Sequence, residues 1–468
     1  MLWRFAAARC RRKVRCASTQ NGGSLVSIRL MAGKSGPANN RESAADALAF
    51  AATVLTVLLG YTLTLAPHVT LGFSGIFATA AMYGGVPHPP GYPLSVLWQQ
   101  AFVTLLPVSN VAWRVSVSSA VAGALACGFI AAMVSRWGRD RNWLDAKKSR
   151  WARVLCGWSA GMIFGFNGAF WGRAVIADVW SFTILLFTAV LFLFQTWAFA
   201  PRRTRVLYAA CFVYGLTLTN SQILLAVAPA LPALIAVGNR ELARDVLLAG
   251  CVVFIAGLIE GCSGVFGVQP EWKLGSLFPV HVAVGLPVLT VTAILVRKTR
   301  RVLTEWKGVL GCTAALVLGL TPYLYVPLSS MTNPPMNWGY ARTTGGFFHA
   351  VSRGQYERVV PTTGAKTFAK QISTYAQSAA KDFGWMYLPF ACVPWFAHRG
   401  LPQRQRSWML ASLVLFACLT LLMIIVLNPP VHTDGVRTIK VFFSASFVVL
   451  AMWVGCGMLM IADGSSRR

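Results

Sequence analysis

Long apolar stretches separated by short polar connections dominate the chain. No Lys, Arg, Asp or Glu lies between Asp46 and Arg114. Apolar stretches long enough for a membrane-spanning helix, about 20 residues, recur to the end of the sequence. The pattern predicts an all-α polytopic membrane protein with about twelve spans, at residues 46–66, 114–134, 153–170, 179–199, 206–220, 223–238, 244–260, 277–296, 308–328, 384–398, 407–428 and 441–462.

Every second connection between these spans is basic. Residues 135–152 and 297–307, for example, are rich in Lys and Arg. Cytoplasmic loops of membrane proteins carry an excess of these residues, so the basic connections and both termini are predicted to face the cytoplasm. The alternate connections then lie on the opposite side of the membrane, and they include two large loops, 67–113 and 329–383.

Composition changes this picture only slightly. The 468 residues are 56% hydrophobic and 12% charged, with a net charge of +28. A charge of that size suggests nucleic-acid binding, but the Lys and Arg residues lie in loops between apolar stretches, so we predict no nucleic-acid partner. The eleven Cys residues occur singly without a CxxC pair, so neither a disulfide framework nor a metal site is predicted.

The N-terminal segment is a separate feature. Residues 1–45 contain nine Lys or Arg and one acid, Glu42. The segment fits a basic cytoplasmic leader, an Arg- and Ser-rich transit peptide, or an extension before a true start at Met31, which we favour. The expected organisation is a leader at 1–45, a transmembrane domain at 46–462 and a short cytoplasmic tail at 463–468.

The stretch "GGVPHPPGYPL", residues 84–94, interrupts the apolar pattern inside the first large loop. Pro donates no N–H and Gly adopts conformations that other residues avoid, so neither a helix nor a strand is expected. The following "LSVLWQQAFVTLLP" is too short to span and predicts an interfacial or re-entrant helix. Irregular backbone at this depth requires protein or a water-filled cavity around it, which indicates a site. His88 alone is weak evidence for catalysis, because no acid lies near it in the sequence.

Few acids are available on the predicted outer side. They are Asp178, Glu260, Glu271, Glu357, Asp382 and Asp434. Asp178 lies at the outer end of a span, five residues after Arg173. A carboxylate at the membrane edge is costly unless it is paired or solvated. Three interpretations of Asp178 stay open: an ion pair with Arg173, a catalytic base, or a ligand for a cation.

Other polar residues of the outer side also allow two interpretations each. Arg114 either snorkels to the membrane surface or holds a phosphate, which suits its guanidinium. The polar end of "GLTLTNSQ", with Asn220 and Gln222, either joins helices or lines a polar pocket. The second loop combines Trp338, Arg353 and Tyr356 with polar residues, which suits either an interfacial aromatic belt or a sugar-phosphate site.

Several motifs together resemble a known family of multi-spanning proteins. They are "GGVPHPPGYPL", "AWRVSVSSAVAGALA", "WGRAVIADVWSF", "GLTLTNSQ", "PYLYVPLSSMTNPPMNWG" and "RTIKVFFSASFVVLA". Their order is similar to that of a GT-C glycosyltransferase family, long of unknown function, that includes the eukaryotic endoplasmic-reticulum O-mannosyltransferase acting on plexin-type receptors. The first and fifth motifs are the specific ones, and the resemblance extends over roughly 46–462.

The resemblance implies a GT-C fold and a reaction. Such enzymes transfer a sugar, here mannose or similar, from a polyprenyl-phosphate carrier to a protein or glycan hydroxyl on the non-cytoplasmic side. The lipid-linked sugar is a co-substrate, and no other cofactor is implied with certainty. Asp178 matches an acidic position and becomes the candidate base. The candidate carrier- and substrate-binding residues are His88, Tyr92, Arg114, Asn220, Gln222, Asn337, Trp338, Arg353 and Tyr356.

The chain lacks acidic residues at positions where the family has them. The family has aspartate–serine–glycine–glutamate where this chain reads "FSGIF", with Phe73 and Ile76 at the acidic places, and Tyr340 replaces an aspartate after "NWG". Transfer to a hydroxyl requires a proton acceptor. Two alternatives therefore remain: a non-catalytic relative that binds lipid-linked sugar or acts as a scaffold, and a transporter of lipid-linked substrate. A bacterial inner membrane is expected in preference to the endoplasmic reticulum.

Overall fold

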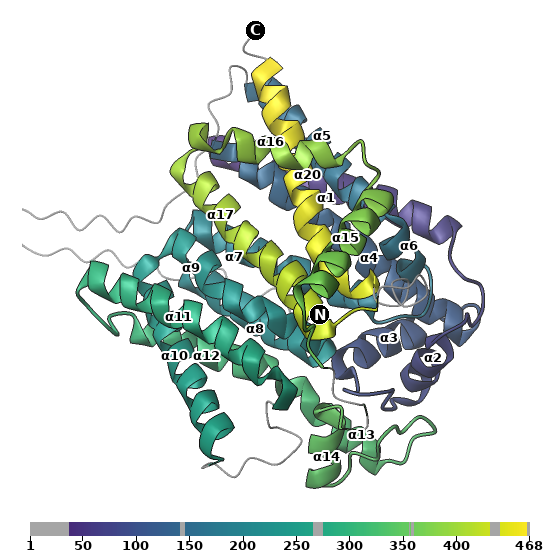
Figure 1. The fold of residues 1–468 in the computed structure, drawn as a ribbon. Helices are drawn as coiled ribbons and strands as arrows, with labels where there is room; N and C mark the ends of the chain where they lie inside the picture. Colours follow the sequence, from purple (N-terminus) through teal and green to yellow (C-terminus); the bar gives the residue numbers. More distant parts are fainter. Residues whose placement is uncertain are drawn as a thin grey trace, which may run out of the picture. The chain divides into compact units, whose positions relative to one another are not determined.

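A computed structural model describes residues 37–140, 146–264, 275–354, 356, 360–430 and 440–465 (Figure 1). Three of the outer acids, Glu271, Glu357 and Asp434, lie outside the described residues. The chain divides into two units, Met1–Asn40 and Arg41–Arg468, and the second is considered below. The domain boundaries expected from the sequence stay predictions.

The described residues form helices, with one isolated β-bridge between Val86 and Asn337. Eight helical segments are long and apolar enough to cross a membrane. They contain α1 (Pro37–Leu63), α4 (Val111–Trp137), α7 (Trp180–Phe199), α10 (Arg240–Ser263), α11 (Phe278–Thr299), α12 (Trp306–Gly319) with α13 (Tyr325–Met331), α17 (Gln403–Ala417) with α18 (Met423–Leu427), and α20 (Ser444–Ser465). The predicted all-α polytopic membrane fold is therefore confirmed.

The other four predicted spans also contain helix, although none of them is among these eight segments. They correspond to α5 (Ala146–Gly165), α8 (Thr204–Asn220), α9 (Leu231–Gly238) with the 3₁₀ turn before it, and α16 (Leu388–Phe396). At about 1.5 Å per residue, the nine residues of α16 reach less than half of a bilayer core. The number twelve therefore stays a prediction.

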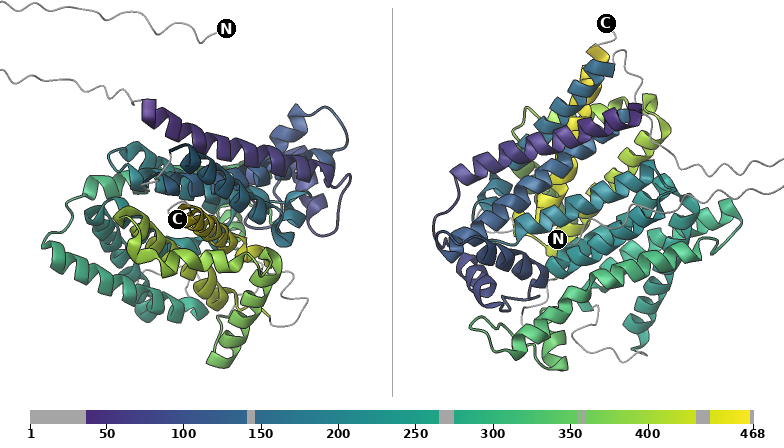
Figure 2. Two further views of the ribbon diagram at one scale, coloured as in Figure 1. Left: turned by 90° about the horizontal axis from the view of Figure 1, so that it is seen from above. Right: turned by 180° about the vertical axis from the view of Figure 1, so that it is seen from behind.

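Helix α4 lies at the centre of the buried core, against α5, α7 and α20 (Figure 2). Small residues allow the close approach of α4 and α5. A Cβ atom added at Gly161 would lie 2.8 Å from the carbonyl oxygen of Cys127, and one at Gly157 would lie 2.5 Å from that of Ala131. Glycine at these two places lets the helix backbones pack directly, which is how membrane helices associate.

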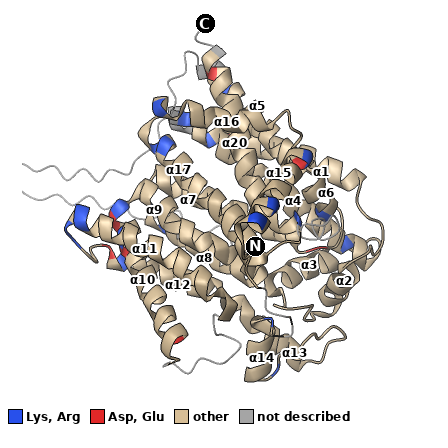
Figure 3. Cartoon of the chain, in the orientation of Figure 1, with Lys and Arg blue, Asp and Glu red and all other residues tan. Residues whose placement is uncertain are grey.

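The basic connections meet at one end of the helices. Arg404 donates to the carbonyl oxygen of Phe199 at 2.9 Å, and Gln405 donates to that of Trp137 at 2.7 Å. Figure 3 shows Lys and Arg where α11 ends and where α17 begins. This convergence is consistent with a shared side of the membrane, and which side it is stays a prediction.

The two large loops that are predicted to lie outside, 67–113 and 329–383, contain helices that are not among the eight candidate spans. The first carries α2 (Ser74–Tyr83) and α3 (Pro93–Leu105), and the second carries α14 (Thr344–Val351) and α15 (Ala365–Phe383). Helix α3 covers the stretch expected to be interfacial or re-entrant, and its 13 residues are too few to cross a bilayer. Exposed Leu97 and Leu105 on α3 are suited to an apolar environment.

Candidate functional site

Backbone hydrogen bonds join the first outer loop to the second. The N–H of Val86 donates to the carbonyl oxygen of Met336 at 2.7 Å, and the N–H of Trp338 donates to that of Val86 at 2.9 Å. The hydroxyl of Ser329 donates to the carbonyl oxygen of Gly84 at 2.5 Å. The Pro- and Gly-rich stretch is therefore attached to the second loop through its backbone.

The residue types of this stretch explain its path. A Cβ atom at Gly85 would collide with the carbonyl oxygen of Met336, so only glycine allows this approach. Gly91 has a φ of +95°, which favours glycine. The Pro89–Pro90 peptide bond is cis. Pro93 then opens α3 at a position where a missing N–H costs no helix hydrogen bond.

Aromatic rings surround His88. Its imidazole centroid lies 4.5 Å from the ring centroid of Phe73, 4.9 Å from that of Tyr92 and 5.7 Å from that of Phe77. Trp338 of the second loop lies 6.4 Å away by the same measure. The His88 residue is only 7% exposed. Two of the predicted binding residues, Tyr92 and Trp338, are thus brought together around a third.

The hydrogen bond of His88 identifies its tautomer. Nδ1 lies 3.1 Å from the carbonyl oxygen of Pro89. A carbonyl oxygen only accepts, so the proton of a neutral ring is on Nδ1 and the lone pair is on Nε2. Burial lowers the pKa of His88, the Pro89 hydrogen bond opposes this shift, and the Arg353 charge lowers the pKa further. The neutral ring is therefore favoured.

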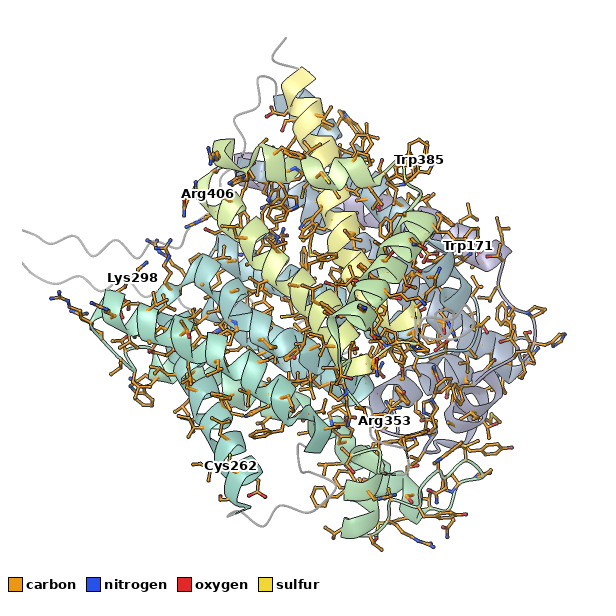
Figure 4. All side chains as sticks on the ribbon, viewed as in Figure 1. Trp171, Cys262, Lys298, Arg353, Trp385 and Arg406 are labelled. Atoms are coloured by element: carbon orange, nitrogen blue, oxygen red, sulfur yellow. The ribbon has the colours of Figure 1, made fainter. Side chains whose placement is uncertain are left out.

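Arg353 supplies the cation of this cluster. Its guanidinium carbon lies 5.1 Å from the ring centroid of Tyr356, and its charge acts on both His88 and Tyr92. Burial raises the pKa of the Tyr92 hydroxyl, and Arg353 opposes that effect. Figure 4 shows Arg353 near α13 and α14, away from Lys298 and Arg406. An exposed cation beside aromatic faces can bind a phosphate or a sugar-phosphate.

Asp178 forms the ion pair that was one interpretation of the sequence. It follows α6 (Gly168–Ala174), and its Oδ2 accepts from Nη1 of Arg173 at 3.0 Å. Its Oδ1 accepts from the N–H of Val179 at 2.6 Å and from that of Trp180 at 3.3 Å, at the start of α7. Burial raises the pKa of Asp178, while Arg173 and these N–H donors lower it. The catalytic role of Asp178 stays a prediction.

Two further predicted residues connect the site to the helices behind it. Gln222 Nε2 donates to the carbonyl oxygen of Val351 at 2.7 Å and to the hydroxyl of Tyr323 at 3.0 Å. Asn220 is fully buried and donates to Thr183 Oγ1 at 2.6 Å. Gln222 therefore contacts the end of α14 near the site, whereas Asn220 joins α8 to α7.

Arg114 lies in a different environment. Its Nε, Nη1 and Nη2 atoms donate to the carbonyl oxygens of Val108, Val103 and Ser109 at 2.9, 3.1 and 2.9 Å. These three bonds hold the connection between α3 and α4. The structure thus gives Arg114 a local structural role, and its phosphate contact stays a prediction.

Asn337 lines an open depression in the second loop. The depression has a volume of about 480 Å³ and is formed by residues 333–338 with Tyr340. Asn337 donates to the carbonyl oxygen of Ser330 at 3.2 Å, and its buried Oδ1 has no hydrogen-bond partner among the described residues. Trp338 belongs both to this depression and to the ring cluster around His88.

Aromatic residues occupy two of the places where the resemblance implies acids. Phe73 packs on His88, and Tyr340 is 63% exposed beside the depression. Asp382 pairs with Lys440 at 3.1 Å. Among the described residues, no group of three or more His, Cys, Asp and Glu side chains is arranged to hold a metal ion.

Sequence reasoning missed some residues that shape the site. Tyr325 donates to the carbonyl oxygen of Gly85 at 3.2 Å, and Phe77 contacts both His88 and Tyr92. Tyr325 and Ser329 both occur in the "PYLYVPLSS" part of a quoted motif. Polar side chains at the end of an apolar span were the available signal, because they require partners.

Comparison with known proteins shows which family part of the chain resembles. Residues 74–244 match the family model described as "Protein O-mannosyl-transferase TMEM260 N-terminal domain". The match covers α2 to the start of α10 and includes His88, Asp178 and Gln222. The resemblance inferred from the motifs is therefore confirmed over this segment.

Two curated relatives carry the same name. The chain is 30% identical to mouse protein O-mannosyl-transferase TMEM260 over 214 residues, which are 44% of this chain and 29% of the mouse protein. It is 28% identical to the Dictyostelium discoideum protein of that name over 170 residues, which are 35% of this chain and 20% of that protein. The chain thus matches less than a third of either relative. Both relatives are eukaryotic, so they give no support to a bacterial inner membrane.

Proposed function

We propose that the chain is a membrane glycosyltransferase. It transfers mannose or a similar sugar from a polyprenyl-phosphate carrier to a protein or glycan hydroxyl on the non-cytoplasmic side. The observation that carries the proposal is the joining of the two outer loops by Val86, Met336 and Trp338. This joining brings the Trp338 ring and the Arg353 cation of the second loop to His88, which lies in the segment that matches the O-mannosyl-transferase family model.

The chemistry of the cluster fits such a donor. Aromatic faces such as Trp338 pack against the apolar faces of sugars, and an Arg fork matches phosphate oxygens. Arg353 is exposed, and its charge acts on His88 and Tyr92. We assign Arg353 to the carrier phosphate, and Trp338 and Tyr356 to the sugar. The apolar surface of α3 suits a polyprenyl chain within the membrane.

A transfer assay tests the proposal. Membranes that contain the chain receive radiolabelled polyprenyl-phosphate mannose or polyprenyl-phosphate glucose, and label in protein and glycan is counted. We expect Arg353→Gln to raise KM for the carrier and Lys366→Gln, an exposed change on α15, to leave it unchanged. Absence of transfer by the wild-type protein with every carrier and acceptor fraction would contradict the proposal.

One observation favours a second candidate function. Phe73, Ile76 and Tyr340 stand where the family has acids, so the chain fits a carrier-binding relative without transferase activity. Retention of radiolabelled carrier by the purified protein, with no transfer, would support this alternative. Movement of the carrier across the membrane of sealed vesicles would instead indicate a transporter. No described feature favours that function. Fractionation of the membranes of the source cell identifies the membrane.

A further inference from the structure

The missing acid at position 73 raises the question of which group accepts the acceptor's proton. Phe73 places its ring 4.5 Å from the imidazole of His88, so the position that carries an acid in the family lies directly beside a histidine here. Asp178 is poorly available, because both its oxygens already accept hydrogen bonds. His88 is the remaining titratable base in the cluster of described residues.

The geometry of His88 suits a proton acceptor. The bond from Nδ1 to the Pro89 carbonyl holds the ring and its tautomer. No described residue forms a hydrogen bond with Nε2, so its lone pair is available to a ligand. The Pro89 carbonyl also stabilises the ring when Nε2 gains a proton, which is the usual arrangement for a histidine base.

We infer that His88 is the general base of the transfer reaction, and that it replaces the acid lost at Phe73. This inference rests on the proposed function. Nε2 of His88 removes the proton of the acceptor hydroxyl while the hydroxyl oxygen forms a bond to the anomeric carbon of the sugar. The bond between that carbon and the carrier phosphate oxygen breaks, and its electron pair leaves with the polyprenyl phosphate. The imidazolium then releases its proton to water.

The surroundings of His88 determine how it titrates. Phe73 and Phe77 of α2 and Trp338 of the second loop contribute uncharged rings. Among the described residues, the titratable or charged groups that act on His88 are Tyr92, at the start of α3, and Arg353, after α14. Asp178, Tyr323 and Tyr356 act on Tyr92. The Arg353 charge favours the neutral ring, which is the form able to accept a proton.

The test compares the wild-type protein with His88→Asn in the transfer assay over a range of pH. We expect kcat of the variant to fall by about 10²- to 10⁴-fold, the usual contribution of a general base, with a smaller change in KM for the carrier. The wild-type kcat should fall on the acid side of the pH profile, and the variant should lack this limb. His68→Asn, an exposed change in the same loop, is the matched control and should behave as wild type.

Restoring the family's acid gives an independent measurement. The double variant Phe73→Asp with His88→Asn should recover transfer, with an acid limb shifted to the lower pH of a carboxylate. A His88→Asn protein that keeps wild-type kcat, or one whose pH profile has the same acid limb as that of the wild type, would overturn the inference and leave the transferase proposal intact. A wild-type protein without transfer would overturn both.

Discussion

Val86 donates its backbone N–H to the carbonyl oxygen of Met336 at 2.7 Å, which connects a loop near the start of the membrane domain with one in its last third. Trp338 returns a bond to the carbonyl of Val86. These two backbone hydrogen bonds join the two loops into one structural unit. The ring cluster around His88 depends on it, because Trp338 comes from the second loop and the other rings come from the first.

Substitution of Gly85 should break this connection. Its Cβ would collide with the Met336 carbonyl oxygen, and backbone cannot yield as a flexible side chain can. We expect Gly85→Ala to destabilise the protein by about 1–3 kcal/mol, the usual range for overpacking. The measurement is thermal unfolding in detergent. Gly172→Ala in α6, where a Cβ meets nothing within 4 Å, is the control and should not lower the melting temperature.

Asp178 should be replaceable by an amide but not by a methyl group. Asn retains an oxygen that accepts from Val179 and Trp180, although it loses the charge paired with Arg173. We expect Asp178→Ala to cost about 1.5–3 kcal/mol, the range for hydrogen bonds to a charged group, and Asp178→Asn to cost less and to retain transfer. Loss of kcat in a stable Asp178→Asn protein would instead identify Asp178 as the base.

Substitution of Arg114 should lower the stability of the protein and leave carrier binding unchanged. A lysine ammonium cannot reproduce the fork that donates to the carbonyls of Val103, Val108 and Ser109. Arg114→Lys should therefore lower the melting temperature without raising KM for the carrier. If this variant instead kept its melting temperature and bound the carrier more weakly, the phosphate role expected from the sequence would be correct.

His88 should make stability depend on pH. Burial lowers its pKa below the ordinary 6.5, so below that pH the unfolded chain binds more protons at this site than the folded protein. The stability contributed by the neutral ring is present above about pH 6.5 and is lost as the pH falls. The melting temperature of wild type should decrease relative to that of His88→Asn on acidification. A constant difference between the two proteins would contradict the lowered pKa.

The sequence predicted the helices well and the contacts of single residues less well. Apolar stretches located the eight described segments that are long and apolar enough to cross a membrane, because a bilayer imposes a minimum length on every span. The sequence also identified residues 84–92 as non-helical, because they are rich in Pro and Gly, whereas Pro93 and Leu94 of the same stretch begin α3. The short α16 shows the limit of this reasoning, since an apolar stretch alone does not reveal how many of its residues are helical.

The candidate site depended on long-range pairing, which periodicity does not encode. Trp338 and Arg353 were recognised as a suitable combination, but only the structure brought both near His88. Arg114 was chosen because its charge lies at an unusual place, and the structure uses that charge on nearby carbonyls. Local composition indicates which groups require partners, and the fold decides which partners they find.

The joining of the two loops through backbone atoms has an evolutionary consequence. The bonds of Val86 with Met336 and Trp338 do not involve the side chain at position 73. That side chain can therefore drift from acid to aromatic without dismantling the scaffold that surrounds it. A lineage that retained this scaffold could lose one reactive group and recruit its neighbour, so the chemistry of the loop could be replaced while its architecture was inherited.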